Sequence, residues 1–166
     1  LVSGAEEARL IYLGVLSGMT FGECPHLLID IGGGSTELVL ADERDARALT
    51  TTKVGAVRLQ RDFINKEPIG SKRRTFLQAF IQGSLEPAVD KISRRIQPGE
   101  KPIMVATSGT ALALGNLIAS EESLPSVKLH GYRFSRSQLD RLVDSLSSMT
   151  LDERRSLPSI NDRRAE

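Results

Sequence analysis

The sequence predicts an α/β fold with a mixed sheet and flanking helices. Its predicted elements come in the order helix, three strands, helices, strand and helices. The first and the last of the predicted strands are short apolar runs, which are typical of buried sheet strands. In the predicted helices the apolar residues recur every three or four positions. We expect residues 1–166 to form a single domain.

The chain begins with a predicted helix and a predicted buried strand. Residues 5–16 carry apolar side chains at helical spacing, and Ser3 is a suitable N-cap before them. We expect this helix to end between Gly14 and Gly18. Residues 27–31 form the first apolar run and stop at three consecutive glycines, so they predict a strand followed by a sharp turn.

Two further strands are predicted over residues 36–41 and 46–53. The charged segment 42–45 between them predicts a hairpin turn. Gly32–Gly34 would link the first strand to the second, so that the three strands form an antiparallel meander. This arrangement places the glycines at the carboxyl end of the first strand.

Helices account for most of the remaining chain. Residues 56–64 predict a short helix, and residues 71–96 predict a long one that Pro87 should kink or split in two. Residues 103–106 form the second apolar run and predict a second buried strand. The turn after this strand leads into an apolar helix over residues 111–118.

Two more helices are predicted from capping signals. Ser135 and Gln138 have the spacing of a capping box ahead of an apolar periodic segment. Thr150 and Glu153 have the same spacing. Each pair therefore predicts the first residues of a helix.

Composition excludes several classes of protein. The 22 lysines and arginines balance 21 acidic residues, so the chain lacks the basic excess of a dedicated nucleic-acid binder. No apolar run approaches the roughly 18 residues of a membrane-spanning helix. The single cysteine, Cys24, excludes an internal disulfide, and no signal peptide is visible. We expect a cytoplasmic protein that binds neither nucleic acid nor a membrane. Because it opens without a methionine and closes on charged residues, we also expect a piece cut from a longer polypeptide at both ends.

The densest chemical signal is Asp-Ile-Gly-Gly-Gly-Ser-Thr-Glu at residues 30–37. Consecutive glycines let main-chain N–H groups approach an anion without a Cβ in the way, and the two hydroxyls add donors. Asp30 and Glu37 are hard oxygen ligands of the kind that Mg²⁺ prefers. The segment therefore predicts a site for Mg²⁺ and phosphate, the alternative being an ordinary glycine turn. The predicted phosphate-binding residues are Gly32, Gly33, Gly34, Ser35 and Thr36.

A second candidate for phosphate binding lies between the last predicted strand and its helix. Ser108, Gly109 and Thr110 occupy this turn. Main-chain N–H groups at a helix N-terminus can bind an anion, because they lack partners within the helix. A plain helix cap is an equally good interpretation of these residues.

Two motifs resemble those of the exopolyphosphatase/guanosine pentaphosphate phosphohydrolase (Ppx/GppA) family. They are the octapeptide at residues 30–37 and the segment Ser-Gly-Ala-Glu-Glu-Ala-Arg-Leu-Ile-Tyr at residues 3–12. Further matches are Gly-Ala-Val-Arg-Leu at residues 55–59, Ala-Thr-Ser-Gly-Thr at 106–110 and Arg-Arg-x-Leu-Pro at 154–158. These matches follow the family's order over nearly the whole chain.

The resemblance implies a ribonuclease-H-like fold of the actin-like ATPase and sugar-kinase superfamily. Two such domains face each other across a cleft in the family, and this chain would be the second of them. The first domain, with its own phosphate loop, is absent from the sequence and would be a partner within the same longer chain. A homodimer is a further arrangement that the sequence leaves open.

The resemblance also implies an exopolyphosphatase that releases terminal phosphate from inorganic polyphosphate, with guanosine pentaphosphate as a second substrate. The family's catalytic glutamate falls on Glu6 or Glu7, and we assign it to Glu7 as the general base that activates water. Two other interpretations stay open. The chain could be a non-catalytic fragment that binds phosphate or dimerises, or a domain of another actin-like ATPase or sugar kinase.

Overall fold

A four-stranded mixed sheet forms the centre of the protein. The computed structural model describes residues 3–64, 68–122, 128–158, 160 and 165. The strands are β1 (His26–Ile31), β2 (Thr36–Ala41), β3 (Ala46–Thr52) and β4 (Ile103–Thr107), in the spatial order β3-β2-β1-β4. The first three strands form an antiparallel meander, and β4 pairs with β1 in parallel. The predicted α/β class, the mixed sheet and the meander are confirmed.

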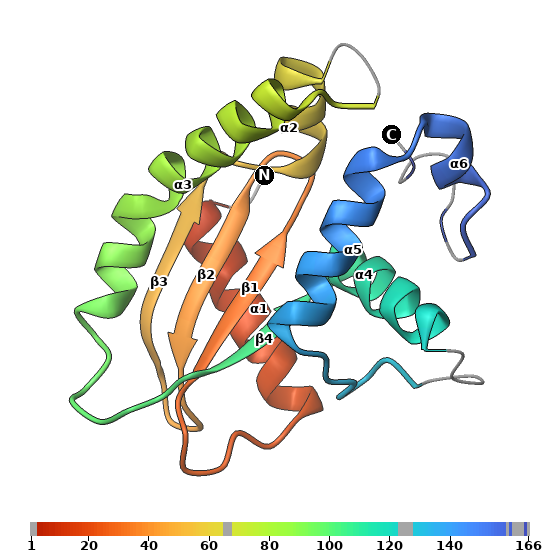
Figure 1. Cartoon of the computed structure of the whole chain (residues 1–166). Helices are drawn as coiled ribbons and strands as arrows, with labels where there is room; N and C mark the ends of the chain where they lie inside the picture. The colour runs from red at the N-terminus through yellow and green to blue at the C-terminus, as the bar shows by residue number, and fades with distance from the viewer. Residues whose placement is uncertain (1–2, 65–67, 123–127, 159, 161–164, 166) are drawn as a thin grey trace.

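Helices cover both faces of this sheet. They are α1 (Gly4–Gly18), α2 (Ala56–Phe63), α3 (Ser71–Ser93), α4 (Ser108–Glu121), α5 (Arg136–Ser148) and α6 (Leu151–Arg155). In Figure 1, α1 lies behind the sheet and α3 in front of it, while α4, α5 and α6 lie to one side. None of the helices in the described part of the chain is long and apolar enough to cross a membrane.

Strand alternation sorts the apolar side chains into two cores. On the face covered by α1, Leu28 and Val39 pack with Ala8 and Tyr12 of the helix. The opposite face of the sheet is covered by α3. Along each strand, the side chains on this face alternate with those that point toward α1. That second core consists of Leu38, Leu40, Ala48, Ala88 and Ile92. Successive side chains along β1 or β2 therefore point alternately toward α1 and toward α3.

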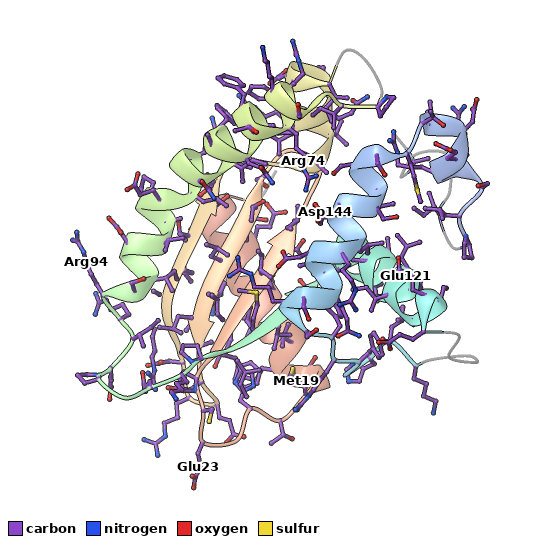
Figure 2. All side chains as sticks on the ribbon, viewed as in Figure 1. Met19, Glu23, Arg74, Arg94, Glu121 and Asp144 are labelled. Atoms are coloured by element: carbon purple, nitrogen blue, oxygen red, sulfur yellow. The ribbon has the colours of Figure 1, made fainter. Side chains whose placement is uncertain are left out.

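The predicted helix caps are present. The Ser3 hydroxyl accepts a hydrogen bond from the Glu6 N–H at the start of α1. Both predicted capping boxes form, at Ser135 for α5 and at Thr150 for α6. Helix α5 then packs on α4 in a third apolar cluster around Leu117, Ile118 and Leu142. On the other side, Arg74 of α3 and Asp144 of α5 point toward one another and form an ion pair (Figure 2).

One detail of the prediction is wrong, and of the two alternatives given for Pro87 one is excluded. The strand predicted as buried, β4, is an edge strand, and its side chains Ile103 and Met104 are 42% and 64% exposed. An apolar run shows that a segment suits a sheet, but it does not show how many neighbours that strand has. Pro87 does not split its helix, because α3 is continuous from Ser71 to Ser93.

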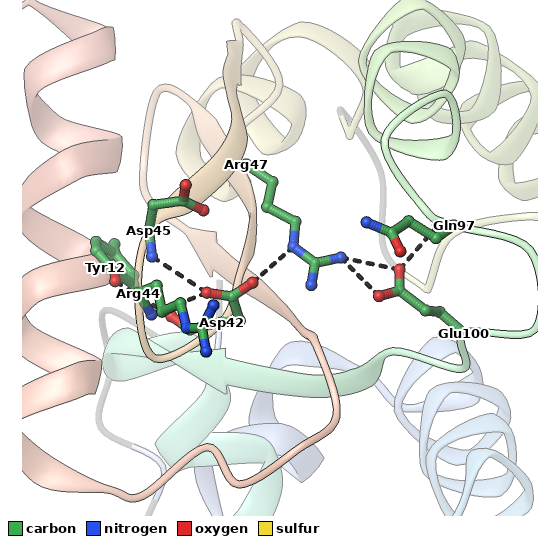
Figure 3. A network of polar contacts seen from close by, with 7 residues as sticks. All are labelled: Tyr12, Asp42, Arg44, Asp45, Arg47, Gln97 and Glu100. Atoms are coloured by element: carbon green, nitrogen blue, oxygen red, sulfur yellow. Dashed lines mark hydrogen bonds and ion pairs between the residues drawn. The ribbon is translucent and has the colours of Figure 1, made fainter.

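A β-bulge sits next to the turn between β2 and β3. Ala41 pairs with Ala46 but Leu40 pairs with Ala48, so Arg47 is the extra residue on β3. The Arg47 guanidinium donates from Nε to Asp42 at 2.7 Å and from one terminal nitrogen to both oxygens of Glu100, at 2.7 and 2.9 Å (Figure 3). These ion pairs hold the bulge against the segment that follows α3.

The carboxylates of this network have lowered pKa values. Burial acts to raise the pKa of Asp42, but the N–H donors of its own turn and the Arg47 guanidinium outweigh burial and lower it. The pKa of Glu100 is lowered first by its hydrogen bond from Arg47 and then by the Gln97 N–H. Both carboxylates are therefore ionised in the folded protein at neutral pH.

Candidate functional site

Four polar residues form a row across the sheet near the carboxyl end of β1. Thr51 pairs with Glu37, Glu37 with Asp30, and Asp30 with Thr107, so each residue comes from a different strand. We call Thr51, Glu37, Asp30 and Thr107 the cross-strand row. Thr51 Oγ1 donates to Glu37 Oε1 at 2.7 Å, and Thr107 Oγ1 donates to Asp30 Oδ2 at 3.0 Å. By alternation all four lie on the face of the sheet that α1 covers.

The two central carboxylates oppose each other directly. Like charges at opposed positions of neighbouring strands are destabilising, and burial increases their cost. Glu37 is only 2% exposed and Asp30 is half-buried, and neither forms an ion pair with a described residue. The pair therefore lacks a compensating positive charge in the described part of the chain.

This donor set fits Mg²⁺. The ion typically takes one or two carboxylates from a protein and completes its shell with water and phosphate oxygens. No group of three or more His, Cys, Asp or Glu side chains among the described residues could hold a metal. The two opposed carboxylates are nevertheless as many protein ligands as Mg²⁺ usually takes, and a divalent cation would offset their repulsion.

The glycine loop lies immediately beyond this pair. The Gly32 N–H donates to the Ser35 carbonyl at 2.9 Å and closes the turn. The carbonyls of Gly32 and Gly33 accept hydrogen bonds from the N–H groups of Ala56 and Arg58 in α2, at 2.9 and 3.0 Å. Gly33 and Gly34 are exposed, and no described residue accepts a hydrogen bond from the N–H of Gly33, Gly34 or Ser35. The loop thus has its carbonyls bound to α2 and N–H groups available for an anion.

Gly55 brings α2 against the loop. A Cβ at this position would lie 2.5 Å from backbone atoms of Gly33 and Gly34, so only glycine allows the approach. Val57, on the first turn of α2, is 66% exposed and lies over Gly33. The match of residues 55–59 to the family therefore has a packing reason in this structure.

Thr36 contributes to the loop in a different way from its neighbours. Its side chain is 4% exposed, and its hydroxyl donates to the Val54 carbonyl at 2.5 Å. By alternation it lies on the α3 face, opposite to Glu37. The hydroxyl predicted to bind phosphate is thus engaged in holding the loop to the segment before α2.

The second predicted phosphate turn lies beside the first. Since β1 and β4 are parallel, their carboxyl ends meet at the same edge of the sheet. The hydroxyls of Ser108 and Thr110 both donate to the Ile31 carbonyl, at 3.4 and 2.9 Å. These hydroxyls join the start of α4 to the end of β1, and Gly109 lies between them. Ser108 has a φ of 71°, a strained conformation for a residue with a side chain.

The N-terminus of α1 lies at the same end of the sheet. A side chain at Gly4 would overlap the methyl group of Thr51, so the helix begins directly on the cross-strand row. At 100° per residue, Glu7 lies 60° around the helix from Gly4, whereas Glu6 lies 160° from it. Glu7 is exposed, and Glu6 forms an ion pair with Arg9 at 3.8 Å. Around the helix axis Glu7 is thus closer than Glu6 to Gly4, while Glu6 is the less exposed of the two.

Comparison with known proteins supports one family. The sequence profile of the Ppx/GppA phosphatase family matches residues 1–166. This chain belongs to the Ppx/GppA phosphatase family. Its sequence is 26% identical to "Exopolyphosphatase 2" of Mycobacterium tuberculosis over the whole chain, which covers 50% of that protein. It is 32% identical to the "Guanosine-5'-triphosphate,3'-diphosphate pyrophosphatase" of Photobacterium profundum, with 96% of this chain and 32% of that protein covered.

Solved structures of the Ppx/GppA family agree with the fold. An exopolyphosphatase from Cytophaga hutchinsonii matches with a TM-score of 0.85 at 25% identity, over 99% of this chain and 52% of that one. An Aquifex aeolicus Ppx/GppA phosphatase matches with a TM-score of 0.78 at 23% identity, over the same shares. The predicted actin-like ATPase fold is therefore confirmed. The chain spans about half the length of the curated exopolyphosphatases that it matches.

Three residues shape this candidate site in ways that the sequence analysis did not predict. Thr51 and Thr107 hold the two carboxylates, and Gly55 sets the position of α2 on the glycine loop. Once the parallel register of β1 and β4 is known, the alternation of side chains places Thr107 on the same face of the sheet as Asp30. Gly55 was visible in the family motif, but its contact with the loop depends on the fold.

Proposed function

We propose that this chain is the second ribonuclease-H-like domain of an exopolyphosphatase. In this proposal the longer protein releases terminal phosphate from inorganic polyphosphate by attack of water, and guanosine pentaphosphate is a second substrate. The observation that carries the proposal is the opposed Asp30 and Glu37 pair directly beside an exposed glycine loop. Membership of the family supports it, because relatives are named for both substrates.

The proposed roles follow the geometry. The N–H groups of Gly33, Gly34 and Ser35 bind the terminal phosphate, and the N-terminus of α4 at Ser108–Thr110 binds a more remote one. Asp30 and Glu37 would hold Mg²⁺. When bound, the ion supplies positive charge that neutralises phosphate oxygens.

Glu7 acts in this proposal as the general base. Hydrolysis of a phosphoanhydride requires a water molecule that is oriented toward the phosphorus and loses a proton as it attacks. Glu7 is exposed on the first turn of α1, so its carboxylate is accessible to such a water molecule. Glu6 is the fallback for the same role.

The direct test is phosphate release from two substrates. The longer protein and this 166-residue chain are each incubated with polyphosphate and with guanosine pentaphosphate, with and without Mg²⁺. We expect Mg²⁺-dependent release by the longer protein, and a far slower rate for the chain alone because the proposed first domain is missing. Release that is equally fast without Mg²⁺ would contradict the metal assignment. Phosphate binding without release in the longer protein would favour the non-catalytic alternative.

A further inference from the structure

Thr51 contacts two parts of the proposed site at once. Its hydroxyl donates to Glu37 Oε1 at 2.7 Å, and its methyl group Cγ2 lies against Gly4 at the start of α1. The three heavy atoms nearest to a Cβ placed on Gly4 all belong to Thr51. Thr51 itself is exposed on the outer strand of the meander.

The hydroxyl contact restricts the orientation of the Glu37 carboxylate. The last torsion of a glutamate side chain is broad, so packing alone defines the carboxylate plane poorly. A hydrogen bond to one oxygen restricts that plane, and partners of this kind strongly influence metal affinity. Glu37 is 2% exposed, so solvent does not replace this hydrogen bond easily.

The methyl contact constrains the first turn of α1. Gly4 can approach the sheet because it has no Cβ, and the Thr51 methyl group fills the space beneath it. Glu7 is three residues further along the same turn, and its N–H donates to the Ser3 carbonyl at 2.9 Å. A shift of this turn would therefore move Glu7 relative to Glu37.

We propose that Thr51 is a positioning residue that sets Glu37 and the first turn of α1 relative to each other. The hydroxyl orients Glu37 toward a bound divalent cation, and the methyl group seats the turn that carries Glu7. This inference rests on the proposed function for the roles of Glu37 and Glu7. The two Thr51 contacts can nevertheless be tested without measuring catalytic turnover.

Two substitutions separate the two contacts. Thr51→Val keeps the methyl group and removes the hydroxyl, whereas Thr51→Ser keeps the hydroxyl and removes the methyl group. Thr50→Val is the matched control, because Thr50 is adjacent on β3 and lies on the opposite face of the sheet. All three variants are made in the full-length protein, and circular dichroism checks their fold.

The first measurement is Mg²⁺ affinity by calorimetry without substrate. We expect Thr51→Val to weaken it by about tenfold, as is typical when a residue that holds a metal ligand is replaced. Thr51→Ser and Thr50→Val should keep the affinity of the unchanged protein. Unchanged affinity in Thr51→Val, or no Mg²⁺ binding by the unchanged protein, would overturn the orienting role.

The second measurement is amide hydrogen exchange at Glu6 and Glu7. We expect Thr51→Ser to speed exchange several-fold and to lower kcat with little change in KM, while Thr51→Val leaves exchange unchanged. Equal exchange in all variants would overturn the seating role. If Thr51→Val loses Mg²⁺ affinity but the unchanged protein hydrolyses neither substrate, the inference stands and the proposed function fails.

Discussion

At the scale of single residues, the unusual feature is a pair of like charges on neighbouring strands. Asp30 and Glu37 oppose each other, and each is held by a threonine hydroxyl. A protein that needed only stability would place neutral side chains there, because opposed carboxylates repel. In the proposed function, a cation shared by the two side chains would offset this repulsion.

The first prediction concerns this pair. Asp30→Asn and Glu37→Gln should each weaken Mg²⁺-dependent phosphate release in the full-length protein by more than about tenfold at low Mg²⁺, because an amide is a poorer ligand for a hard cation. The fold should survive, since the repulsion is relieved. The measurement is a Mg²⁺ titration of the rate, with Asp140→Asn on exposed α5 as the control. Parental rates across the titration in both variants would contradict the metal assignment.

The second prediction concerns Glu7. Glu7→Gln keeps the volume but removes the base, so kcat should fall on the order of 10²- to 10⁴-fold while KM changes little. Glu6→Gln is the control, because Glu6 shares the helix turn but lies on its far side. Steady-state kinetics on polyphosphate measure both. A larger loss from Glu6→Gln would transfer the role to Glu6.

Some site residues could be predicted from sequence and others could not. Asp30, Glu37 and the glycines lie within eight residues, so their chemistry is visible without a fold. Thr51 is different. Counting outward from the pair Ala41 and Ala46 would place Thr50 opposite Glu37, and the bulge at Arg47 moves Thr51 there instead. A one-residue shift of this kind has no signal in the sequence.

At the scale of elements, the contact between the glycine loop and α2 leaves no space for a side chain at Gly55. Our third prediction is that Gly55→Ala destabilises the protein by roughly 1–3 kcal/mol, because its Cβ would meet backbone atoms that cannot move independently. Gly83→Ala in α3 is the matched control. Its Cβ would meet nothing within 4 Å, and alanine favours a helix by roughly 0.5–1 kcal/mol. Urea denaturation of both variants measures the difference, and equal effects would contradict the proposed contact.

The elements themselves were largely predictable from local patterns. Ser3, Ser135 and Thr150 mark helix starts through their own hydrogen bonds, so the caps could be identified from spacing. The position of β4 at the sheet edge could not, because exposure depends on neighbours that a strand's composition does not specify. Sequence also gives no register, and register is what brings Thr107 beside Asp30.

At the scale of the whole molecule, the Arg47 network joins the turn after β2 to the segment after α3. Our fourth prediction is that Arg47→Met lowers the melting temperature at pH 7. The lowered pKa values of Asp42 and Glu100 mean that these carboxylates stabilise the fold above their unfolded pKa values, near pH 4, and stop doing so as the pH falls through their folded values. The deficit of Arg47→Met should therefore shrink below about pH 4.

Thermal unfolding at several pH values between about 3 and about 7 measures this dependence, because carboxylates titrate in the lower part of that range. Arg136→Met is the control, because Arg136 is 92% exposed in its pair with Asp140 and such pairs contribute little. A deficit for Arg47→Met that stays constant as the pH falls would show that packing, and not the ion pairs, explains the loss.

The glycine loop also has a genetic consequence. In the proposed function, main-chain N–H groups of the loop bind the phosphate. A single-base change in the codon for Gly33 or Gly34 that replaces the glycine therefore keeps the N–H donor, and its only direct effect is to add a side chain that hinders the anion. Neighbouring side chains are under no such restriction: Val57 lies over the loop, and Arg58 is on the same turn of α2. Selection for a different phosphate compound would therefore act on codons 57 and 58 sooner than on the loop.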